Sequence, residues 1–192
     1  CRNCGGSISL RYPAVELLTG LLFMAVAWRF GPSWWTSIHC LFVAALIAAA
    51  MIDYDHQLLP CNITVPFLWL GLALSLFNIF TDLTSSVIGA MAGYLILWSV
   101  YQLFKLLTKK EGMGFGDFKL LAALGAWAGF NYLPLIILIS SVIGSISGIT
   151  MLVFGKTRQQ QPIPFGPYLA VAGWIALLWG ETINTTYLEL LP

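Results

Sequence analysis

The chain has 192 residues, of which 59% are hydrophobic and 9% are charged, and its formal net charge is +1. Its mean hydropathy is +0.85, whereas a water-soluble domain of this length needs far more polar surface; the composition therefore predicts a helical bundle in a lipid bilayer. A net charge near zero, with no basic stretch carrying interleaved aromatic residues, excludes nucleic acid as a partner.

Seven apolar runs follow one another along the chain, separated by proline, glycine and charged residues. At about 20 residues for each crossing, they predict an all-α, polytopic transmembrane helical bundle of about seven spans. The fifth run is short for a full crossing, so we expect it to be tilted in thinned bilayer or buried among its neighbours. Small residues in the sequence GAMAG favour close helix contact. The expected spans are residues 13–30, 36–52, 63–80, 85–108, 117–130, 133–154 and 165–180.

The N-terminal sequence CRNCGG holds the two cysteines whose spacing has chemical meaning. Cys1 and Cys4 form a CxxC knuckle, which is half of a tetrathiolate zinc site. Cys40 and Cys61 are isolated in the sequence and cannot supply the second pair. The chain starts without an initiator methionine or a signal sequence, so we expect that an upstream region is missing and that a closed zinc site would need cysteines from it.

The distribution of lysine and arginine predicts which ends of the spans face the cytoplasm. With a cytoplasmic N-terminal segment and alternating spans, all of the nine basic residues except Arg29 lie on or near that side. The same alternation places the loops at residues 53–62 and 109–117 on the cytoplasmic side. Asp53 ends the second span and Asp117 begins the fifth, so these two carboxylates lie at the same membrane depth and could meet.

A close pair of carboxylates in a site of restricted water shares one proton, because both cannot ionise cheaply. The ionised partner can then act as a general base for water, and the protonated partner can polarise a carbonyl group. Gly114 and Gly116, in the sequence GMGFGD, are expected to allow positive φ angles and the close approach of a substrate backbone. The alternative interpretation is that Asp117 only caps a helix and that Asp53 is a solvated loop residue.

Three further features surround this candidate pair. Asp55 competes for the same catalytic position, and with His56 it is a weak candidate for a metal pair, because zinc needs three or four ligands. Glu16, near the start of the first span, is either a helix-capping acid or an intramembrane partner of the site. The proline-rich segment 159–173 cannot be helical before about residue 166, so it forms either a wall of a substrate groove or a rigid turn.

Four sequence motifs together resemble those of the bacterial prepilin peptidases, the GxGD aspartic membrane proteases that process type IV pilins and type II secretion pseudopilins. The motifs are CRNCGGSISLRYPAVELLTG, MIDYDHQLLP, GMGFGDFKLLAALGAW and IPFGPYLA. The resemblance covers nearly the whole chain and implies that Asp53 and Asp117 are the catalytic aspartates, which decides between Asp53 and Asp55. We interpret residues 1–12 as the remnant of a cytoplasmic cysteine-knuckle domain and residues 13–192 as the transmembrane aspartic peptidase domain.

The resemblance also implies a substrate and cofactors. Such enzymes cleave a short basic leader from prepilin or pseudopilin precursors on the cytoplasmic side of the bacterial inner membrane, so these precursors and the lipid bilayer are the expected partners. The peptidase chemistry needs no cofactor. Many members also N-methylate the new terminal residue with S-adenosylmethionine, and their zinc domain uses two CxxC pairs, of which only Cys1 and Cys4 are present. Zinc binding and methyl transfer are thus expected of a full-length protein, with no residue here assigned to the methyl donor.

Two other functions stay open. An intramembrane GxGD protease of different specificity would share the paired aspartates, but we expect it to lack the cysteine knuckle and to cut inside transmembrane helices. A small proton-linked transporter would need a polar path across the membrane midplane. The span centres of this chain are almost purely apolar, so the transporter is the weaker alternative.

Overall fold

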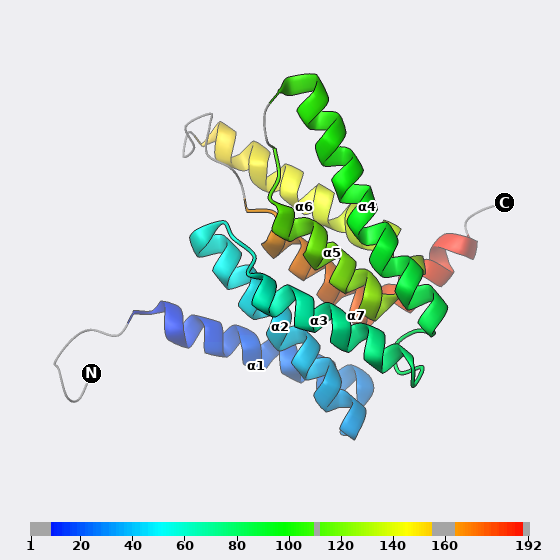
Figure 1. Cartoon of the computed structure of the whole chain (residues 1–192). Coiled ribbons are helices and arrows are strands. Elements are labelled where there is room, and N and C mark those ends of the chain that lie inside the picture. Colours follow the sequence, from blue (N-terminus) through cyan, green and yellow to red (C-terminus); the bar gives the residue numbers. More distant parts are fainter. Residues whose placement is uncertain (1–8, 110–111, 155–163, 190–192) are drawn as a thin grey trace. The chain divides into compact units, whose positions relative to one another are not determined.

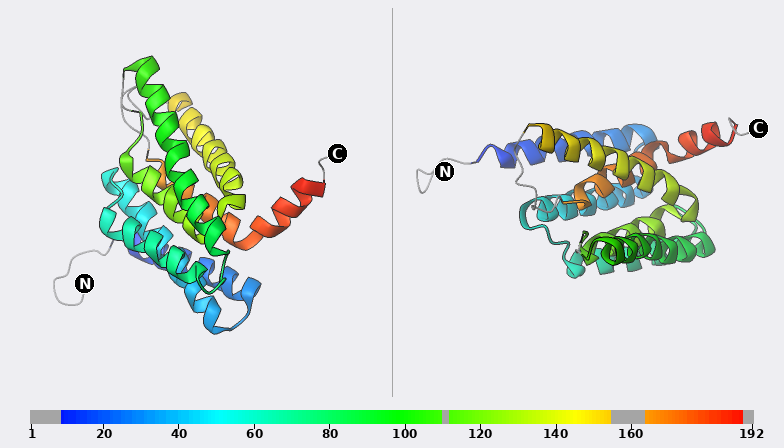
Figure 2. Two further views of the ribbon diagram at one scale, coloured as in Figure 1. Left: turned by 45° about the vertical axis from the view of Figure 1, so that its right-hand side comes forward. Right: turned by 90° about the horizontal axis from the view of Figure 1, so that it is seen from above.

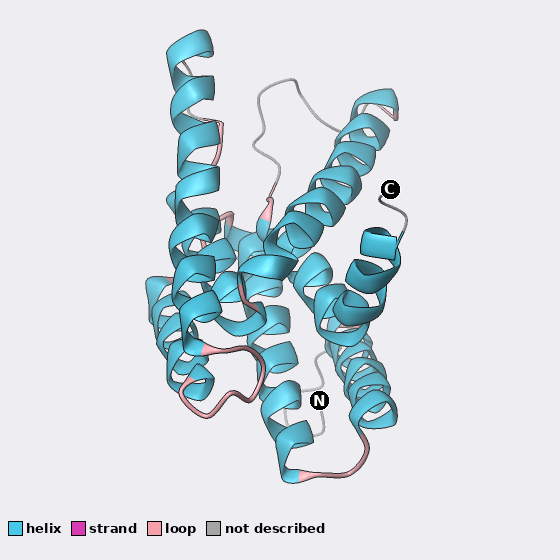
Figure 3. Ribbon diagram, turned by 90° about the vertical axis from the view of Figure 1, so that its right-hand side faces the viewer, coloured by secondary structure: helices cyan, strands magenta, loops and turns pink. Residues whose placement is uncertain are grey.

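The computed structural model describes residues 9–109, 112–154 and 164–189. These residues form helices joined by short loops, with no strand among them (Figure 3). The helices, labelled in Figure 1, are α1 (Arg11–Phe30), α2 (Trp34–His56), α3 (Cys61–Ser75), α4 (Leu83–Thr108), α5 (Phe115–Ala128), α6 (Leu133–Val153) and α7 (Gly166–Glu189), with a short 3-10 helix, Phe130–Tyr132, before α6. The all-α prediction is confirmed, and each helix begins close to the start of the apolar run that predicted it.

Four helical segments of the described chain are long and apolar enough to cross a membrane. They are Arg11–Phe30, Trp34–His56, Leu83–Thr108 and Phe130–Met151, and α3 is a shorter apolar helix. Helix α5 is not one of them, because it has only 14 residues and buries most of them. The structure therefore supports a helical membrane bundle, and it shows that the short fifth run is buried among its neighbours.

The chain divides into two compact units, Cys1–Ala44 and Ala45–Pro192, with the boundary inside α2. In the first unit, Gly31 ends α1 with a φ of 73°, and its carbonyl accepts a hydrogen bond from the Thr36 hydroxyl. The Phe30 and His39 rings stack with their centroids 4.0 Å apart, so the turn between α1 and α2 is closed by local contacts.

Helix α5 lies at the centre of the second unit, in contact with α3, α4 and α7 (Figures 1 and 2). The indole N–H of Trp127 on α5 donates a hydrogen bond to the Phe67 carbonyl of α3, with a nitrogen–oxygen distance of 2.7 Å. On the other side, the Ser86 hydroxyl of α4 donates to the Ala126 carbonyl. These bonds satisfy polar groups that would otherwise be buried without a partner, and they fix α5 between its neighbours.

Glycines bring the backbones of α4 and α5 together, as the GAMAG sequence predicted. A Cβ atom added at Gly93 would lie 2.6 Å from the Leu121 carbonyl oxygen, and one at Gly89 would meet the Gly125 carbonyl. Close approach of this kind is a common means of packing helices in membranes. It sets the position of α5, whose first turn carries Asp117.

Candidate active site

Asp53 lies in the last turn of α2 and is only 5% exposed. Gln57 ends this helix with a φ of 52°, and its backbone N–H donates to the Asp53 carbonyl at 2.8 Å. The left-handed residue turns the chain into a short loop, which leads to α3 through Pro60. The aspartate side chain is thereby held at a helix end within the second unit.

Asp117 lies in the first turn of α5 and is 6% exposed. Gly114 is the N-cap of this helix, with a φ of −77° and a ψ of 145°, and the Asp117 backbone N–H donates to its carbonyl at 3.2 Å. Among the described glycines, the positive φ angles occur at Gly31 and Gly129. The expectation of positive φ angles at Gly114 and Gly116 is therefore wrong.

The structure gives Gly116 a different reason to be glycine. A Cβ atom at this position would lie 2.5 Å from the Leu59 Cβ and 3.3 Å from the Leu59 backbone nitrogen. Leu59 is itself buried and belongs to the loop that follows α2. The missing side chain thus lets the loop after Asp53 pack directly on the first turn of α5, and so brings the two aspartates to one place.

We expect Gly116→Ala to destabilise the protein, because neither the α2–α3 loop nor the helix start can yield without moving backbone. Overpacking of this kind costs about 1–3 kcal/mol. Gly114→Ala is the matched control, since the nearest atom to its added Cβ is the Asp117 Oδ2 at 3.7 Å. Thermal unfolding in detergent measures both variants, and equal midpoints would contradict the packing role of Gly116.

Both aspartates line one pocket of about 570 Å³ in the second unit, a volume in the usual range for ligand sites. Its walls come from the end of α2 and the loop after it, the start of α3, the first turns of α5 and the residues just before α7. Besides the two aspartates, the lining residues are Gln57, Leu58, Leu59, Cys61, Gly112, Met113, Gly114, Phe115, Gly116, Lys119, Pro164 and Phe165.

The two carboxylates have different environments. The Asp53 Oδ2 accepts a hydrogen bond from the Gly166 backbone N–H at 2.9 Å, whereas the Asp117 Oδ1 is buried and has no hydrogen-bond partner among the described residues. Burial first, and then the negative charge of Asp53, raise the pKa of Asp117 to about 7, against the opposing effect of a backbone hydrogen bond from Gly114. A pair of this kind can carry one proton and one charge near neutral pH.

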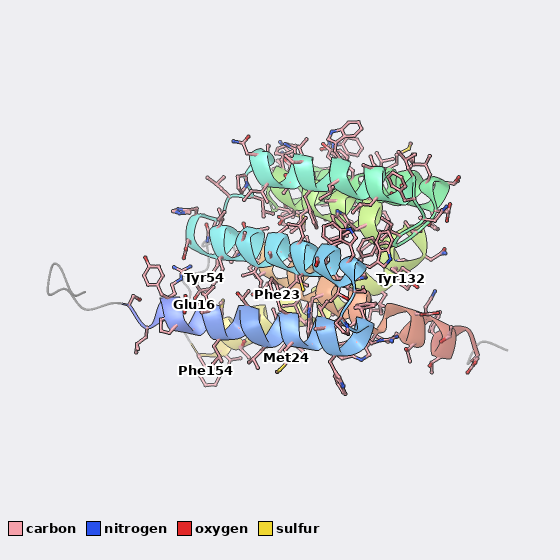
Figure 4. The ribbon with its side chains drawn as sticks, turned by 90° about the horizontal axis from the view of Figure 1, so that it is seen from below. Glu16, Phe23, Met24, Tyr54, Tyr132 and Phe154 are labelled. Carbon is pink, nitrogen blue, oxygen red and sulfur yellow. The ribbon has the colours of Figure 1, made fainter. Side chains whose placement is uncertain are left out.

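The other candidates from the sequence lie in different places. Asp55 and His56 are exposed at the end of α2 and are not among the residues that line the pocket. Residues 9–109, 112–154 and 164–189 contain no group of three potential metal ligands, so Asp55 and His56 belong to no such group within these residues. Glu16 lies on α1 in the first unit (Figure 4), and its role as a partner of the site stays a prediction.

The zinc prediction rests on Cys1 and Cys4, which lie outside the described residues. The described cysteines do not replace them, since Cys40 lies on α2 in the first unit and Cys61 begins α3 in the second. The proline-rich segment is described from Pro164 onward. Pro164 and Phe165 line the pocket and α7 begins at the next residue, in agreement with the expected helix start and with a wall of a groove.

Sequence reasoning missed several residues of the pocket. Lys119 lies one turn inside α5, and its ammonium group donates to the Cys61 Sγ at 2.8 Å. Lys119 comes two residues after Asp117, a spacing that does not place two side chains on one face of a helix, so the sequence holds no signal for it. Cys61 and Gly166 reach the pocket through tertiary packing, and nothing in their own sequence windows indicates it.

A membrane bundle whose two buried aspartates face one pocket defines the class of this chain as a polytopic membrane protein with a paired-carboxylate site. The chain matches the type IV leader peptidase family over residues 40–149. It also matches the bacterial peptidase A24 N-terminal domain over residues 1–30. The chain therefore belongs to the type IV leader peptidase family.

Curated relatives agree with this assignment. The chain is 57% identical over 189 residues to a prepilin leader peptidase/N-methyltransferase of Stutzerimonas stutzeri, and 56% identical over 188 residues to a protein of that name from Aeromonas hydrophila. A third relative with this name, from Pseudomonas aeruginosa, is 54% identical over 189 residues. Each alignment covers 98% of this chain and 65% of the relative. No solved structure matches the chain.

Proposed function

We propose that the protein is a membrane aspartic endopeptidase that removes the basic leader of type IV prepilins or of type II secretion pseudopilins. The observation that carries this proposal is the pair Asp53 and Asp117, buried together at one pocket although 64 positions separate them in the sequence (117 − 53). Family membership supplies the reaction class, and the names of the relatives supply the substrate.

The two aspartates can hydrolyse a peptide bond without a metal. The ionised carboxylate takes a proton from water, whose oxygen attacks the carbonyl carbon, while the protonated carboxyl gives its proton to the carbonyl oxygen. When the resulting gem-diol collapses, the C–N bond breaks and the leaving nitrogen takes the proton held by the first carboxyl. The second carboxyl regains a proton from the diol, so each turnover consumes one water and restores the pair.

The proposed orientation follows from the charges at the ends of the spans. Eight of the nine basic residues, all except Arg29, fall on or near one side of the membrane when the spans alternate, which favours a cytoplasmic location for that side. Asp53 and Asp117 belong to the same side. The site would then face the cytoplasm at the bacterial inner membrane, where a basic leader would stay while the apolar helix of the precursor lies along the bundle.

The names of the relatives add N-methylation of the new N-terminus as a second proposed activity. S-adenosylmethionine would supply the methyl group in that reaction. We assign none of the described residues to this donor.

The proposed reaction predicts a dependence on pH. The raised pKa of Asp117, about 7, means that its carboxyl keeps the proton below that pH and loses it above. We therefore expect kcat for cleavage to fall as the pH rises through about 7, because two ionised carboxylates leave no acid for the carbonyl oxygen. A rate constant across pH 5 to 9 on a soluble peptide substrate measures this, and a rate that keeps rising above pH 8 would contradict the shared proton.

The function is tested with a purified precursor pilin and the full-length protein in detergent. Mass spectrometry of the products reads the cut position and any added methyl group. A cut at the end of the leader supports the proposal, whereas a cut within the transmembrane helix of the precursor points to an intramembrane protease of other specificity. Absence of any cut, together with proton flux in proteoliposomes, would replace the peptidase with a transporter.

A further inference from the structure

The first residue of α7 lies directly against the Asp53 side chain. The Gly166 backbone N–H donates to the Asp53 Oδ2 at 2.9 Å. Gly166 is the first residue of α7, so this N–H is one of the donors that a helix start leaves without an internal partner. The positive end of the helix dipole also points toward the carboxylate. Both effects favour a negative charge on Asp53.

The space around Gly166 is closed to any side chain. A Cβ atom there would lie 2.7 Å from the Asp53 Oδ2 and 3.0 Å from its Cγ. The glycine is thus required by the close approach of the aspartate, whatever its own backbone conformation. Without a side chain at this position, the Gly166 backbone N–H approaches the carboxylate to hydrogen-bond distance.

The start of α7 is itself anchored on α6. The Tyr168 hydroxyl and the Ser147 hydroxyl form a hydrogen bond of 2.7 Å. A Cβ atom at Gly144 of α6 would lie 3.2 Å from the Tyr168 ring and 3.5 Å from the Phe165 ring, so both rings pack closely on this helix. The backbone N–H that faces Asp53 is therefore held in place by the packing of the start of α7 on α6.

The surroundings of Asp117 differ, because its carboxylate receives one backbone hydrogen bond, from Gly114, while its buried Oδ1 has no hydrogen-bond donor among the described residues. The other ionisable groups that line the pocket are Cys61 of α3 and Lys119 of α5, which contact one another. Asp55 and His56 of α2 are exposed beyond the pocket. The first turn of α7 contains no charged residue. Its one titratable side chain, Tyr168, forms a hydrogen bond with Ser147 of α6.

We propose that Gly166 is a positioning residue of the site: its backbone N–H holds Asp53 as the ionised carboxylate that activates water and leaves the shared proton on Asp117. This inference rests on the proposed peptidase function and deepens it, since it assigns the two roles. In the cycle described above, Asp53 then takes the proton from water and passes it to the leaving nitrogen. Asp117 gives its proton to the carbonyl oxygen and regains one when the gem-diol collapses.

The first test compares Gly166→Ala with Gly173→Ala in the full-length protein. Gly173 lies about two turns further along the same face of α7, and its added Cβ would meet the flexible Leu124 side chain at 2.5 Å. For Gly166→Ala, we expect kcat for precursor cleavage to fall about 10- to 100-fold and the acidic limb of the pH profile to move up by about one pH unit. Gly173→Ala keeps the pH profile of the unmodified protein.

A lower rate for Gly166→Ala with an unchanged pH profile would reduce Gly166 to a packing role and overturn the inference. The proposed function fails separately, if Asp53→Asn and Asp117→Asn both cleave the precursor normally. The Gly166 variant does not enter that comparison, so the two failures are distinguishable.

A second measurement needs no substitution at Gly166 and no activity. Labelling with ¹³C-carbonyl phenylalanine and ¹⁵N-glycine selects the amides of Phe–Gly pairs, which in this chain are Phe30–Gly31, Phe115–Gly116, Phe154–Gly155 and Phe165–Gly166. We expect the Gly166 amide proton to shift with pH as Asp53 ionises, and this titration to vanish in Asp53→Asn. An amide that does not titrate in the unmodified protein would overturn the inference even if Gly166→Ala fails to fold.

Discussion

Replacing either Asp53 or Asp117 with asparagine is expected to abolish precursor cleavage while the protein still inserts in the membrane. Asparagine keeps the size of the side chain but can neither accept a proton from water nor give one to the carbonyl oxygen. General acid or base catalysis contributes about 10²–10⁴-fold to a rate, and the two groups act in one step. Each single variant should therefore lose at least that factor in kcat, and the double variant should lose little more.

Folding is not expected to explain this loss. The buried Asp117 Oδ1 has no hydrogen-bond partner among the described residues, and a neutral amide at that position removes the repulsion from Asp53 that contributes to its raised pKa. The thermal midpoint of Asp117→Asn should thus equal or exceed that of the unmodified protein. High stability combined with absent cleavage is the signature of a reacting group.

Asp55→Asn is the variant that separates the two neighbouring acids. Asp55 is exposed on α2, two positions after the buried Asp53, so we expect its replacement to leave cleavage in place. Gel or mass-spectrometric assays of all three variants at equal membrane abundance decide the matter. Total loss in Asp55→Asn with normal cleavage by Asp53→Asn would move the catalytic pair.

The helices were predictable from the sequence because hydrophobic length is the dominant constraint on a chain in lipid. The short fifth run was predicted at residues 117–130, within two residues of both ends of α5, and the proline-rich segment predicted a helix start at about residue 166, where α7 begins. Asp53 and Asp117 were paired by charge counting and alternation, without knowledge of any contact. These predictions depend on properties that each segment carries in itself.

The remaining parts of the site depend on which segments meet. The reason for Gly116 lies in Leu59 and that for Gly166 lies in Asp53, and neither partner can be identified from spacing. The expectation of positive φ angles at Gly114 and Gly116 failed for this reason, since a glycine is needed equally for backbone conformation and for close approach. A single sequence does not separate those two causes.

Gly125→Val is expected to prevent stable folding, or to lower the free energy of unfolding by about 3 kcal/mol or more, the upper end of overpacking costs. The added Cβ would lie 2.5 Å from the Gly89 carbonyl carbon and 3.2 Å from the Ala90 nitrogen. Both atoms belong to the backbone of α4, so no side-chain rotation can relieve the contact. The helices must separate, and the buried hydrogen bond from Ser86 to the Ala126 carbonyl is then strained or lost.

Gly20→Ala serves as the control, because Gly20 also lies inside a helix and no atom comes within 4 Å of its added Cβ. Alanine in place of glycine favours a helix by about 1 kcal/mol, so this variant should be as stable as the unmodified protein or more stable. Thermal unfolding in detergent and membrane abundance measure both variants.

The consequence of Gly125→Val for the site distinguishes displacement of α5 from a general loss of stability. Gly125 lies about two turns after Asp117 on the same helix, so a rigid shift of α5 would move this aspartate away from Asp53. Any folded fraction of Gly125→Val should then cleave the precursor more slowly per molecule than the unmodified protein. A folded fraction with full specific activity would show that the relative position of Asp53 and Asp117 does not depend on the close packing of α4 and α5.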